Sequence, residues 1–282
     1  MRIARIRDSQ GQTFVARLDG ASAVPLLHAP EAVGVDHLRN ALAAGVDLTA
    51  APPVAEPFDL AGGTLLSPVS APQKLIAIGL NYADHAREAG LEPPAAPIAF
   101  AKFASSIIGP DQPIRYRKSD SEQVDYEVEL AAVIGRQARD VSESDALGHV
   151  AGYTVCNDVS ARDAQFSDGQ WVRGKSFDTF CPLGPWLVTA DEVPDPQALG
   201  IRCRVNGQTL QDGNTQEMIF SVAELVSYLS RFMTLEPGDV IATGTPYGVG
   251  FARTPQVFLL DGDVVECEID AVGTLSNAVI VE

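Results

Sequence analysis

The sequence predicts a mostly β protein with some α+β elements, in which a rolled or sandwiched, largely antiparallel sheet is more probable than a doubly wound α/β fold. Three observations predict this class. Many short strand-like segments separated by turn signals follow Lys74, only one long helix is clearly marked, and a Pro/Gly-rich connector occupies residues 51–63. Because the composition changes after this connector, we expect a small N-terminal α+β domain at 1–70 and a larger domain at 71–282.

The N-terminal segment shows both strand and helix periodicity. RIARIR (2–7) and TFVARLD (13–19) alternate apolar and polar residues, as strands with one buried face do. VDHLRNALAAG (35–45) has the apolar spacing of a short helix that ends at Gly45. These elements together predict a small α+β unit.

The larger domain contains most of the predicted strands and one strong helix. Asn206-Gly207 lies between alternating residues and predicts a two-residue hairpin. Ser221 and Glu224 form a capping box ahead of apolar residues at helical spacing, and Pro237 follows the end of this helix. The predicted strands are KLIAIGL (74–80), YEVELAAVIG (126–135), GYTVCND (152–158), IRCRVNGQTL (201–210), DVIATG (239–244) and VVECEI (264–269).

Composition excludes several classes of function. The chain has 282 residues, of which 46% are hydrophobic, so it can bury a full core. Its 37 acidic and 20 basic residues give a net charge of -17, which opposes binding to nucleic acid or to anionic membranes. No apolar run reaches the roughly 18 to 20 residues of a membrane span. The N-terminus lacks the apolar region of a secretory signal, and the four cysteines form no C-x-x-C pair, so we expect a cytoplasmic protein with reduced thiols.

The segment VDYEVELAAVIG (124–135) places three acids on one face of a predicted strand. The repulsion between Asp125, Glu127 and Glu129 requires either open water or a cation. Glu127 and Glu129 can present oxygen ligands to one divalent ion, and Asp158, where another predicted strand ends, can supply a third. All-oxygen ligands favour Mg²⁺, Mn²⁺ or Ca²⁺ over zinc. The alternative is a solvated outer face of an edge strand, and the pattern alone favours neither.

GLNYADHAREAG (79–90) predicts a short helix that ends before Gly90. On this helix His85 and Glu88 stand at i and i+3, so that they can form a hydrogen bond. A histidine oriented by a carboxylate is a common general base, and the flanking glycines would allow the helix to move as a lid. A surface contact without functional consequence is the alternative.

RGKSFDTFCPLGPW (173–186) places Lys175 among glycine, aromatic and proline residues. A lysine partly withdrawn from water suits the stabilisation of an enolate or an oxyanion, although a surface lysine is the more common case. Arg162 and Gln165 follow Asp158 by four and seven residues. Arg162 can hold a substrate carboxylate, and a salt bridge to a neighbouring acid is an equal alternative.

TGTPYGVG (243–250) follows a predicted strand and contains three glycines and one proline. Such a turn can direct backbone N–H groups toward an anion. It lacks the ending of a P-loop, and a tight structural turn would explain it equally well.

These segments, taken in order, resemble the fumarylacetoacetate hydrolase family over about Lys74 to Val281. The tract GKSFDTFCPLGPWLVT (174–189) is most similar to the branch that contains fumarylacetoacetate hydrolase domain-containing protein 2 and hydroxyheptadienedioate isomerases. The segments that carry the resemblance are NYADHAREAG (81–90), DYEVELAAVIG (125–135), GYTVCNDVSARDAQ (152–165), GKSFDTFCPLGPW (174–186), RCRVNGQTLQDGNT (202–215) and LEPGDVIATGTPYGVG (235–250).

The resemblance implies a mixed β-roll of the fumarylacetoacetase C-terminal type, a small N-terminal domain and a homodimer. It implies Mg²⁺ or Mn²⁺ bound by Glu127, Glu129 and Asp158, with Asp125 solvated or beside the ligands. It also implies a set of roles around the metal, with His85 and Glu88 on a lid, Lys175 at the reacting oxygens, Arg162 and Gln165 in the pocket, and Thr245 in a turn that receives a substrate carboxylate.

The expected reaction is metal-dependent hydrolysis of a C–C bond in a 2,4-dioxo acid of the acylpyruvate or fumarylpyruvate type. It would proceed through an enolate, with a water molecule activated by His85. Decarboxylation or tautomerisation of oxaloacetate, or isomerisation of hydroxyheptadienedioate, passes through a similar enolate and is the alternative at the same site. A non-catalytic small-molecule binding module is the alternative of another class, and the joint presence of base, ligands and Lys175 speaks against it.

Overall fold

In the computed structural model, which describes residues 1–282, strands make up most of the regular structure, as predicted. The strands are β1 (Arg2–Arg7), β2 (Thr13–Asp19), β3 (Ser22–His28), β4 (Phe58–Asp59), β5 (Thr64–Leu66), β6 (Leu75–Gly79), β7 (Ile98–Lys102), β8 (Ile107–Ile108), β9 (Ile114–Tyr116), β10 (Val124–Asp125), β11 (Val128–Ile134), β12 (Val150–Asn157), β13 (Ser160–Ala161), β14 (Cys181–Thr189), β15 (Gly200–Val205), β16 (Gln208–Asn214), β17 (Val240–Ala242), β18 (Val264–Ile269) and β19 (Gly273–Val281). The α-helices are α1 (His37–Ala43), α2 (Ala83–Glu88), α3 (Glu143–Ala146), α4 (Arg162–Phe166), α5 (Trp171–Lys175) and α6 (Val222–Phe232).

The strands form one long mixed sheet and two smaller sheets. The long sheet runs in the order β4-β3-β2-β1-β14-β12-β11-β17-β6-β7, and a five-stranded sheet runs β16-β15-β18-β19-β9. Most neighbours are antiparallel, whereas β17 and β6 pair in parallel. β10 and β13 form a separate two-stranded pair. The β12–β11 region of the long sheet and the five-stranded sheet enclose the main hydrophobic core together with α6.

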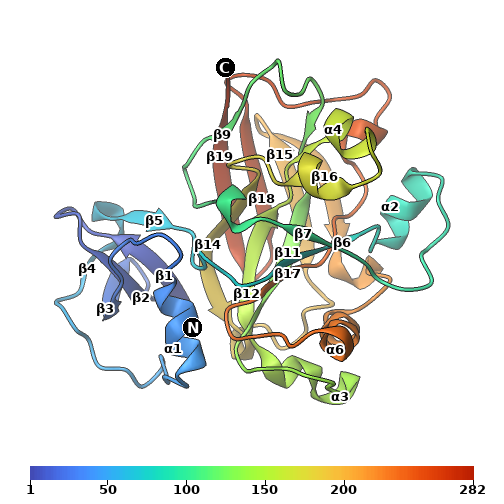
Figure 1. Cartoon of the computed structure of the whole chain (residues 1–282). Coiled ribbons are helices and arrows are strands. Elements are labelled where there is room, and N and C mark those ends of the chain that lie inside the picture. Colours follow the sequence, from blue (N-terminus) through green and yellow to red (C-terminus); the bar gives the residue numbers. More distant parts are fainter.

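The N-terminal strands extend the long sheet at one side. β1 pairs with β14 through Arg2↔Val188 and Ile3↔Leu187, so the backbone hydrogen bonding is continuous from the N-terminal segment into the rest of the molecule. The predicted strands at 2–7 and 13–19 and the predicted helix are confirmed. Figure 1 shows this segment, in blue, beside the body of the molecule. A domain boundary at residue 70 stays a prediction.

Local sequence signals correspond closely to the elements they predicted. Asn206 and Gly207 have φ values of 52° and 78°, and they join β15 to β16 as a two-residue hairpin turn. Both bonds of the capping box at Ser221 and Glu224 are present at the start of α6. None of the helices combines the length and apolar character that a bilayer crossing requires.

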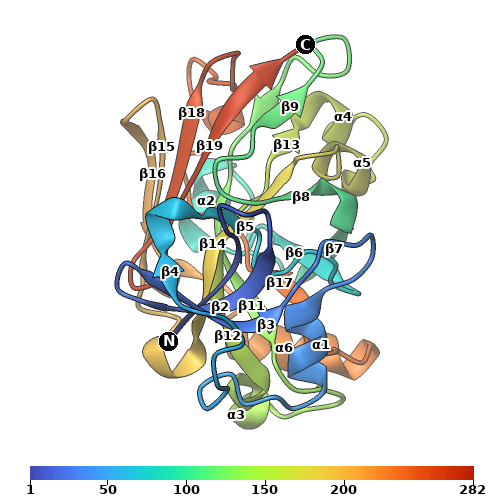
Figure 2. The ribbon, with the colours of Figure 1, turned by 90° about the vertical axis from the view of Figure 1, so that its left-hand side faces the viewer.

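The two nine-residue strands, β14 and β19, were not predicted, and neither were the shorter β3 and β7. β14 contains Pro182 and Pro185, and proline usually argues against a strand inside a sheet because it lacks a backbone donor. β14 nevertheless lies between β1 and β12. The second nine-residue strand, β19, pairs with β18 and β9 in the five-stranded sheet. Figure 2 shows β18 and β19 rising beside β9 toward the C-terminus, with α4 and α5 nearby.

Candidate metal centre and active site

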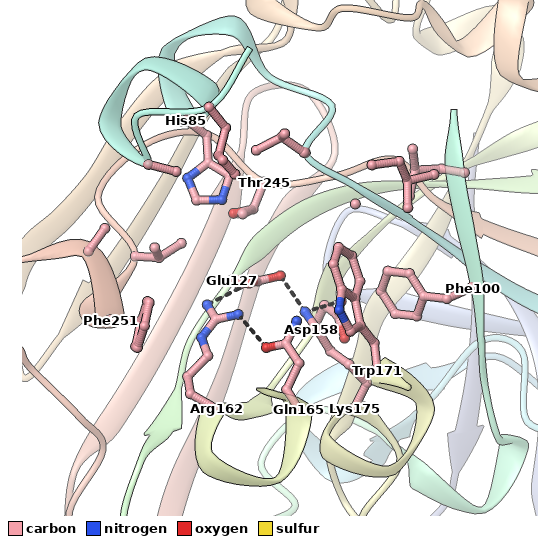
Figure 3. A pocket seen from close by; sticks show the side chains of 18 of the residues that line it. His85, Phe100, Glu127, Asp158, Arg162, Gln165, Trp171, Lys175, Thr245 and Phe251 are labelled. Atoms are coloured by element: carbon pink, nitrogen blue, oxygen red, sulfur yellow. Dashed lines mark hydrogen bonds and ion pairs between the residues drawn. The ribbon is translucent and has the colours of Figure 1, made fainter. Parts of the chain in front are cut away.

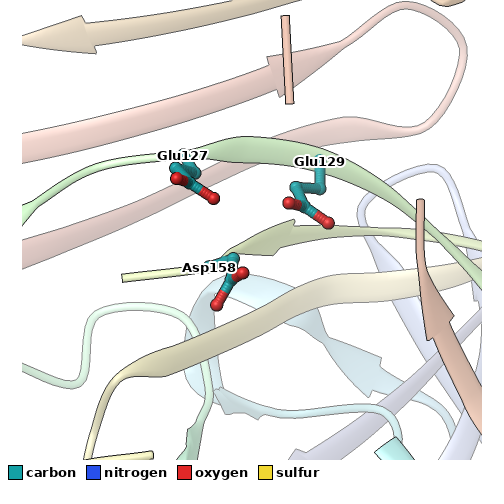
Figure 4. A group of neighbouring side chains, drawn as sticks. All are labelled: Glu127, Glu129 and Asp158. Carbon is teal, nitrogen blue, oxygen red and sulfur yellow. The ribbon is translucent and has the colours of Figure 1, made fainter. Parts of the chain in front are cut away.

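Three acids converge where β10 and β12 end and β11 begins. Glu127 lies between β10 and β11, Glu129 lies on β11, and Asp158 directly follows β12. The antiparallel register pairs Val128 with Asn157, and the Asp158 N–H donates to the Glu127 carbonyl at 2.9 Å. One carboxylate oxygen from each acid lies within 4.8 Å of the others, as Figure 4 shows. Asp158 therefore presents a hard oxygen donor to the same point as Glu127 and Glu129, which lie 31 and 29 positions before it in the chain.

This arrangement rules out a solvated outer face. Glu127, Glu129 and Asp158 are 5%, 1% and 0% exposed. Of the two alternatives for Asp125, solvated or beside the ligands, the first is wrong because this side chain is fully buried. The second agrees with the structure, since Arg162 contacts both Asp125 and Glu127. The Asp125 carboxylate accepts hydrogen bonds from the Gly250 N–H at 2.8 Å and from the Arg162 Nε at 2.9 Å. Gly250 and Arg162, which contact Asp125, lie far from it in the sequence. The strand pattern alone therefore could not predict its burial.

The electrostatics of the three acids fit a divalent cation. Burial raises the pKa of Glu129 well above its ordinary value, and the charges of Asp158 and Glu127 raise it further. Burial would also raise the pKa of Glu127, but the charges of Lys175 and Arg162 lower it to about 2. A divalent ion bound by these oxygens would favour the charged form of every carboxylate. It would therefore lower the raised pKa of Glu129 and remove the difference from Glu127. The donor set is therefore suited to Mg²⁺ or Mn²⁺.

Lys175 lies across two of the three acids. Its Nζ is 2.7 Å from Glu127 Oε2 and 2.7 Å from Asp158 Oδ2, and the residue is 2% exposed. It therefore does not behave as a surface lysine. Burial lowers the pKa of Lys175, but the charges of Asp158 and Glu127 outweigh this effect and raise it, so the ammonium group stays charged.

Arg162 forms salt bridges with the acids of the site. On α4, its Nη2 is 2.8 Å from Asp125 Oδ2 and 2.6 Å from Glu127 Oε1, while its Nη1 donates to Gln165 Oε1 at 3.0 Å. Of the two alternatives, the structure shows the salt bridge. Burial lowers the pKa of Arg162, but Glu127 and Asp125 raise it above the ordinary value. A role for Arg162 and Gln165 in substrate binding stays a prediction.

His85 and Glu88 lie together on the predicted helix. α2 covers both residues, and His85 Nδ1 is 3.3 Å from Glu88 Oε2. Both Glu88 carboxylate oxygens accept the Gly248 N–H at 3.0 Å, so α2 is attached to the glycine-rich turn. Gly90 follows the helix with a φ of 66°, a conformation that glycine adopts readily. This geometry would orient the imidazole for proton transfer.

The glycine-rich turn directs its N–H groups toward anions, but these anions belong to the protein. Gly244 N–H donates to Glu129 Oε2 at 2.9 Å, Gly248 donates to Glu88, and Gly250 donates to Asp125. The Thr245 hydroxyl donates to the Val128 carbonyl at 2.9 Å. The turn therefore positions three functional carboxylates, and capture of a substrate carboxylate at Thr245 stays a prediction.

Lys102 belongs to the site, although the sequence did not identify it. Its Nζ is 2.6 Å from Asp158 Oδ1 and also donates to the Lys175 carbonyl, and it is 3% exposed. The available signal was a single charge within the apolar segment IAFAKFA (98–104). Such a lysine must find a buried partner, and strand β7 directs it toward Asp158.

A cavity of about 440 Å³ opens above these groups. Figure 3 shows His85 and Thr245 on one side of Glu127, with Arg162 and Gln165 on the other. All nine residues proposed from the sequence line this cavity, namely His85, Glu88, Glu127, Glu129, Asp158, Arg162, Gln165, Lys175 and Thr245. A cation site, a histidine base and a buried ammonium group in one cavity can stabilise an enolate and move a proton.

Comparison with known proteins agrees with this chemistry. Residues 74–280 match the family described as fumarylacetoacetate (FAA) hydrolase C-terminal. The mitochondrial oxaloacetate tautomerase of Xenopus laevis is 55% identical over 219 residues, which cover 77% of this chain and 68% of that protein.

Solved structures with similar folds cover the whole chain, among them two proteins with named activities. The 2-hydroxyhepta-2,4-diene-1,7-dioate isomerase of Mycobacterium marinum is 38% identical, with a TM-score of 0.82 over 100% of this chain and 99% of that one. The fumarylacetoacetate hydrolase of Exiguobacterium antarcticum is 39% identical, with a TM-score of 0.85 over 100% of both chains. The chain belongs to the fumarylacetoacetate hydrolase family.

Proposed function

We propose that this protein is a Mg²⁺- or Mn²⁺-dependent tautomerase that interconverts the enol and keto forms of oxaloacetate or a related 2-oxo acid. The observation that carries the proposal is the convergence of Glu127, Glu129 and Asp158 within 4.8 Å in a cavity that His85 also lines. The names of the Xenopus tautomerase and the Mycobacterium isomerase support this reaction over the C–C hydrolysis favoured by the sequence.

Tautomerisation makes modest chemical demands. One proton leaves the enol oxygen, one proton is added to the neighbouring carbon, and no bond between heavy atoms breaks. The reaction therefore needs a group that moves a proton and positive charge beside the oxygen, but no attacking water. When bound, the divalent ion would offset negative charge on the oxygens of the substrate.

The protein side chains can supply the remaining requirements. His85 would carry the proton, and Glu88 would orient its ring through Nδ1, leaving Nε2 available to the substrate. Lys175 would place its ammonium group beside the developing oxygen charge. Glu127 and Asp158 hold this ammonium group in the absence of substrate, so it is already positioned.

Hydrolysis of an acylpyruvate is the second candidate. The His85–Glu88 contact favours it, because the same oriented imidazole can activate a water molecule. The Exiguobacterium protein, named as a hydrolase, supports this candidate at the level of the fold and family.

A direct comparison separates the reactions. The Mn²⁺-loaded protein is mixed with enol oxaloacetate, and the loss of ultraviolet absorbance is compared with the uncatalysed loss while CO₂ is measured in parallel. We expect accelerated loss without CO₂. Release of CO₂ at the same rate would identify a decarboxylase, and faster cleavage of acetylpyruvate would restore hydrolysis as the main reaction.

Sedimentation of the same sample tests the homodimer that the family resemblance implies.

A further inference from the structure

The cavity has an apolar side that the proposed reaction does not use. The acids, Arg162, Lys175 and His85 form its polar side. Figure 3 shows Trp171 and Phe100 together on one side of Glu127 and Asp158. The apolar side of the cavity includes Ile78, Leu80, Leu91, Ile98, Phe100 and Trp171.

Trp171 and Phe100 form an aromatic corner next to the reacting end of the cavity. Their ring centroids are 5.4 Å apart with an interplanar angle of 74°. Lys175 Nζ lies 5.5 Å from the centroid of the Phe100 ring. The indole lies directly against Gly79, where a Cβ atom would overlap the ring. A planar group attached to a substrate whose oxygens reach Lys175 would therefore lie beside two aromatic side chains.

The cavity offers no free cation for a second substrate carboxylate. Its arginine and its lysine, Arg162 and Lys175, are both paired with acids of the protein. Lys175 and the metal ligands serve the 2-oxo acid end of a substrate, and the net charge of -17 disfavours a dianion further. Among the side chains that line the cavity, the distal carboxylate of bound oxaloacetate would have His85, Gln165 and Thr245 as polar partners, but no unpaired arginine or lysine to offset its desolvation.

The apolar residues around the opening are also unusual for an unliganded surface. Leu91 and Ile98 are 56% and 40% exposed, and both line the same cavity as Phe100 and Trp171. Leu80, at the end of β6, has a φ of 52°. A leucine in the left-handed region is strained, and such strain is concentrated at functional sites.

The geometry points to a substrate class, namely 2-oxo acids that carry an apolar group of aryl size on the carbon next to the keto group. The inference rests on the proposed tautomerase reaction and identifies its preferred substrates. The chain converts the enol of such a monoanion, for which phenylpyruvate is the probe, more efficiently than enol oxaloacetate. The enol oxygen loses one proton and the neighbouring carbon gains one, so no further reactant is consumed.

The first experiment compares two enols and two inert analogues. We expect kcat/KM of the Mn²⁺-loaded protein to be roughly tenfold higher for enol phenylpyruvate than for enol oxaloacetate. Phenyllactate and malate are the corresponding 2-hydroxy acids and cannot enolise. Calorimetric titration should show phenyllactate binding roughly tenfold more tightly than malate, which measures the preference without turnover.

A charge variant tests whether the apolar side of the cavity binds the apolar group of the substrate. Ile98→Arg places a cation at a 40% exposed position on the edge strand β7, so folding should be retained. It should reduce the phenylpyruvate-to-oxaloacetate ratio roughly tenfold, because the arginine pairs with the second carboxylate and opposes the ring. Leu260→Arg is the matched control, since Leu260 is 66% exposed and lies outside the cavity, and it should leave the ratio unchanged.

The outcomes distinguish this inference from the proposed function. If oxaloacetate is converted while phenylpyruvate is inert and phenyllactate fails to bind, the apolar subsite is refuted and the tautomerase stands. If phenyllactate binds, with the predicted loss in Ile98→Arg, but neither enol is converted, the subsite stands and the tautomerase is refuted. Equal phenylpyruvate-to-oxaloacetate ratios in Ile98→Arg and Leu260→Arg would refute the binding of the apolar group at the apolar side of the cavity.

Discussion

Lys102 Nζ lies 2.6 Å from Asp158 Oδ1, and neither side chain has meaningful access to solvent. Lys175 donates to the other oxygen of the same carboxylate at 2.7 Å. Because Lys102 also donates to the Lys175 carbonyl, it connects the acid to the helix that carries the second lysine. Lys102 thereby positions two groups of the proposed active site without lining the cavity.

Replacement of Lys102 by methionine should destabilise the metal-free protein. We expect Lys102→Met to lower the free energy of unfolding by about 3 kcal/mol, because the Asp158 carboxylate loses one of its two buried cations. Mn²⁺ should recover part of this loss, since the ion replaces the missing charge. Urea unfolding with and without Mn²⁺ measures both effects.

Lys74→Met is the matched control for this prediction. Lys74 pairs with the buried Asp239 at 2.8 Å, and neither residue lines the cavity. This variant should also be destabilised, but Mn²⁺ should stabilise it only as much as it stabilises the wild type. An equal additional recovery in both variants would show that Mn²⁺ acts elsewhere than at Asp158.

Replacement of His85 should affect the chemical step. We expect His85→Ala to lower kcat for enol oxaloacetate roughly 100-fold with a small change in KM, because the variant lacks the group that moves the proton. Glu88→Gln keeps a side chain of similar shape and should cause a smaller loss. His28→Ala, at an exposed position on β3, is the control. Steady-state rates at saturating Mn²⁺ provide the test, and full activity in His85→Ala would exclude this residue as the base.

Asp84, next to His85 on α2, should make stability depend on pH. Burial raises the pKa of Asp84 above its ordinary value. The folded state then retains a proton that the unfolded state releases, so this contribution to stability is complete below the unfolded pKa and is lost as pH rises through the folded pKa. Asp84→Asn should therefore be more stable than the wild type at pH ~7, with little gain at pH ~3.5.

Asp270→Asn should change stability at neutral pH in the opposite direction from Asp84→Asn. The hydrogen bond from Arg202 holds the pKa of Asp270 below its ordinary value, so its stabilising contribution is present at neutral pH and is lost on acidification. This variant should be slightly less stable than the wild type at pH ~7, by about 0.5 kcal/mol for a pair near the surface. Urea titrations at the two pH values test both variants, and a gain for Asp84→Asn that is larger in acid would contradict the assignment.

Signals within short segments predicted much of the fold and part of the site. The Asn206-Gly207 turn and the Ser221 cap depend on neighbouring residues alone, so they could be identified without knowledge of the fold. The spacing of Glu127 and Glu129 likewise placed two carboxylates on one face of a strand, but it did not decide between a metal site and a solvated face.

Features that depend on distant partners were missed or misjudged. For Asp125 the sequence could not decide between a solvated side chain and one beside the ligands, because the turn that buries it lies more than a hundred residues later in the chain. Lys102 could be placed beside Asp158 only after β7 was known to flank β6 at the end of the sheet. The prolines of β14 concealed a strand that tertiary pairing nevertheless forms.

A calorimetric titration of the metal-free protein with Mn²⁺ is the most direct test of the metal centre, performed on the wild type and on Glu129→Gln. Glutamine retains the shape of Glu129 and an acceptor for the Gly244 N–H, so the variant should fold with at least wild-type stability. We expect one Mn²⁺ per wild-type chain and a loss of affinity of roughly 100-fold or more in the variant. Absence of binding to the wild type at millimolar Mn²⁺, or equal affinity in both proteins, would contradict it.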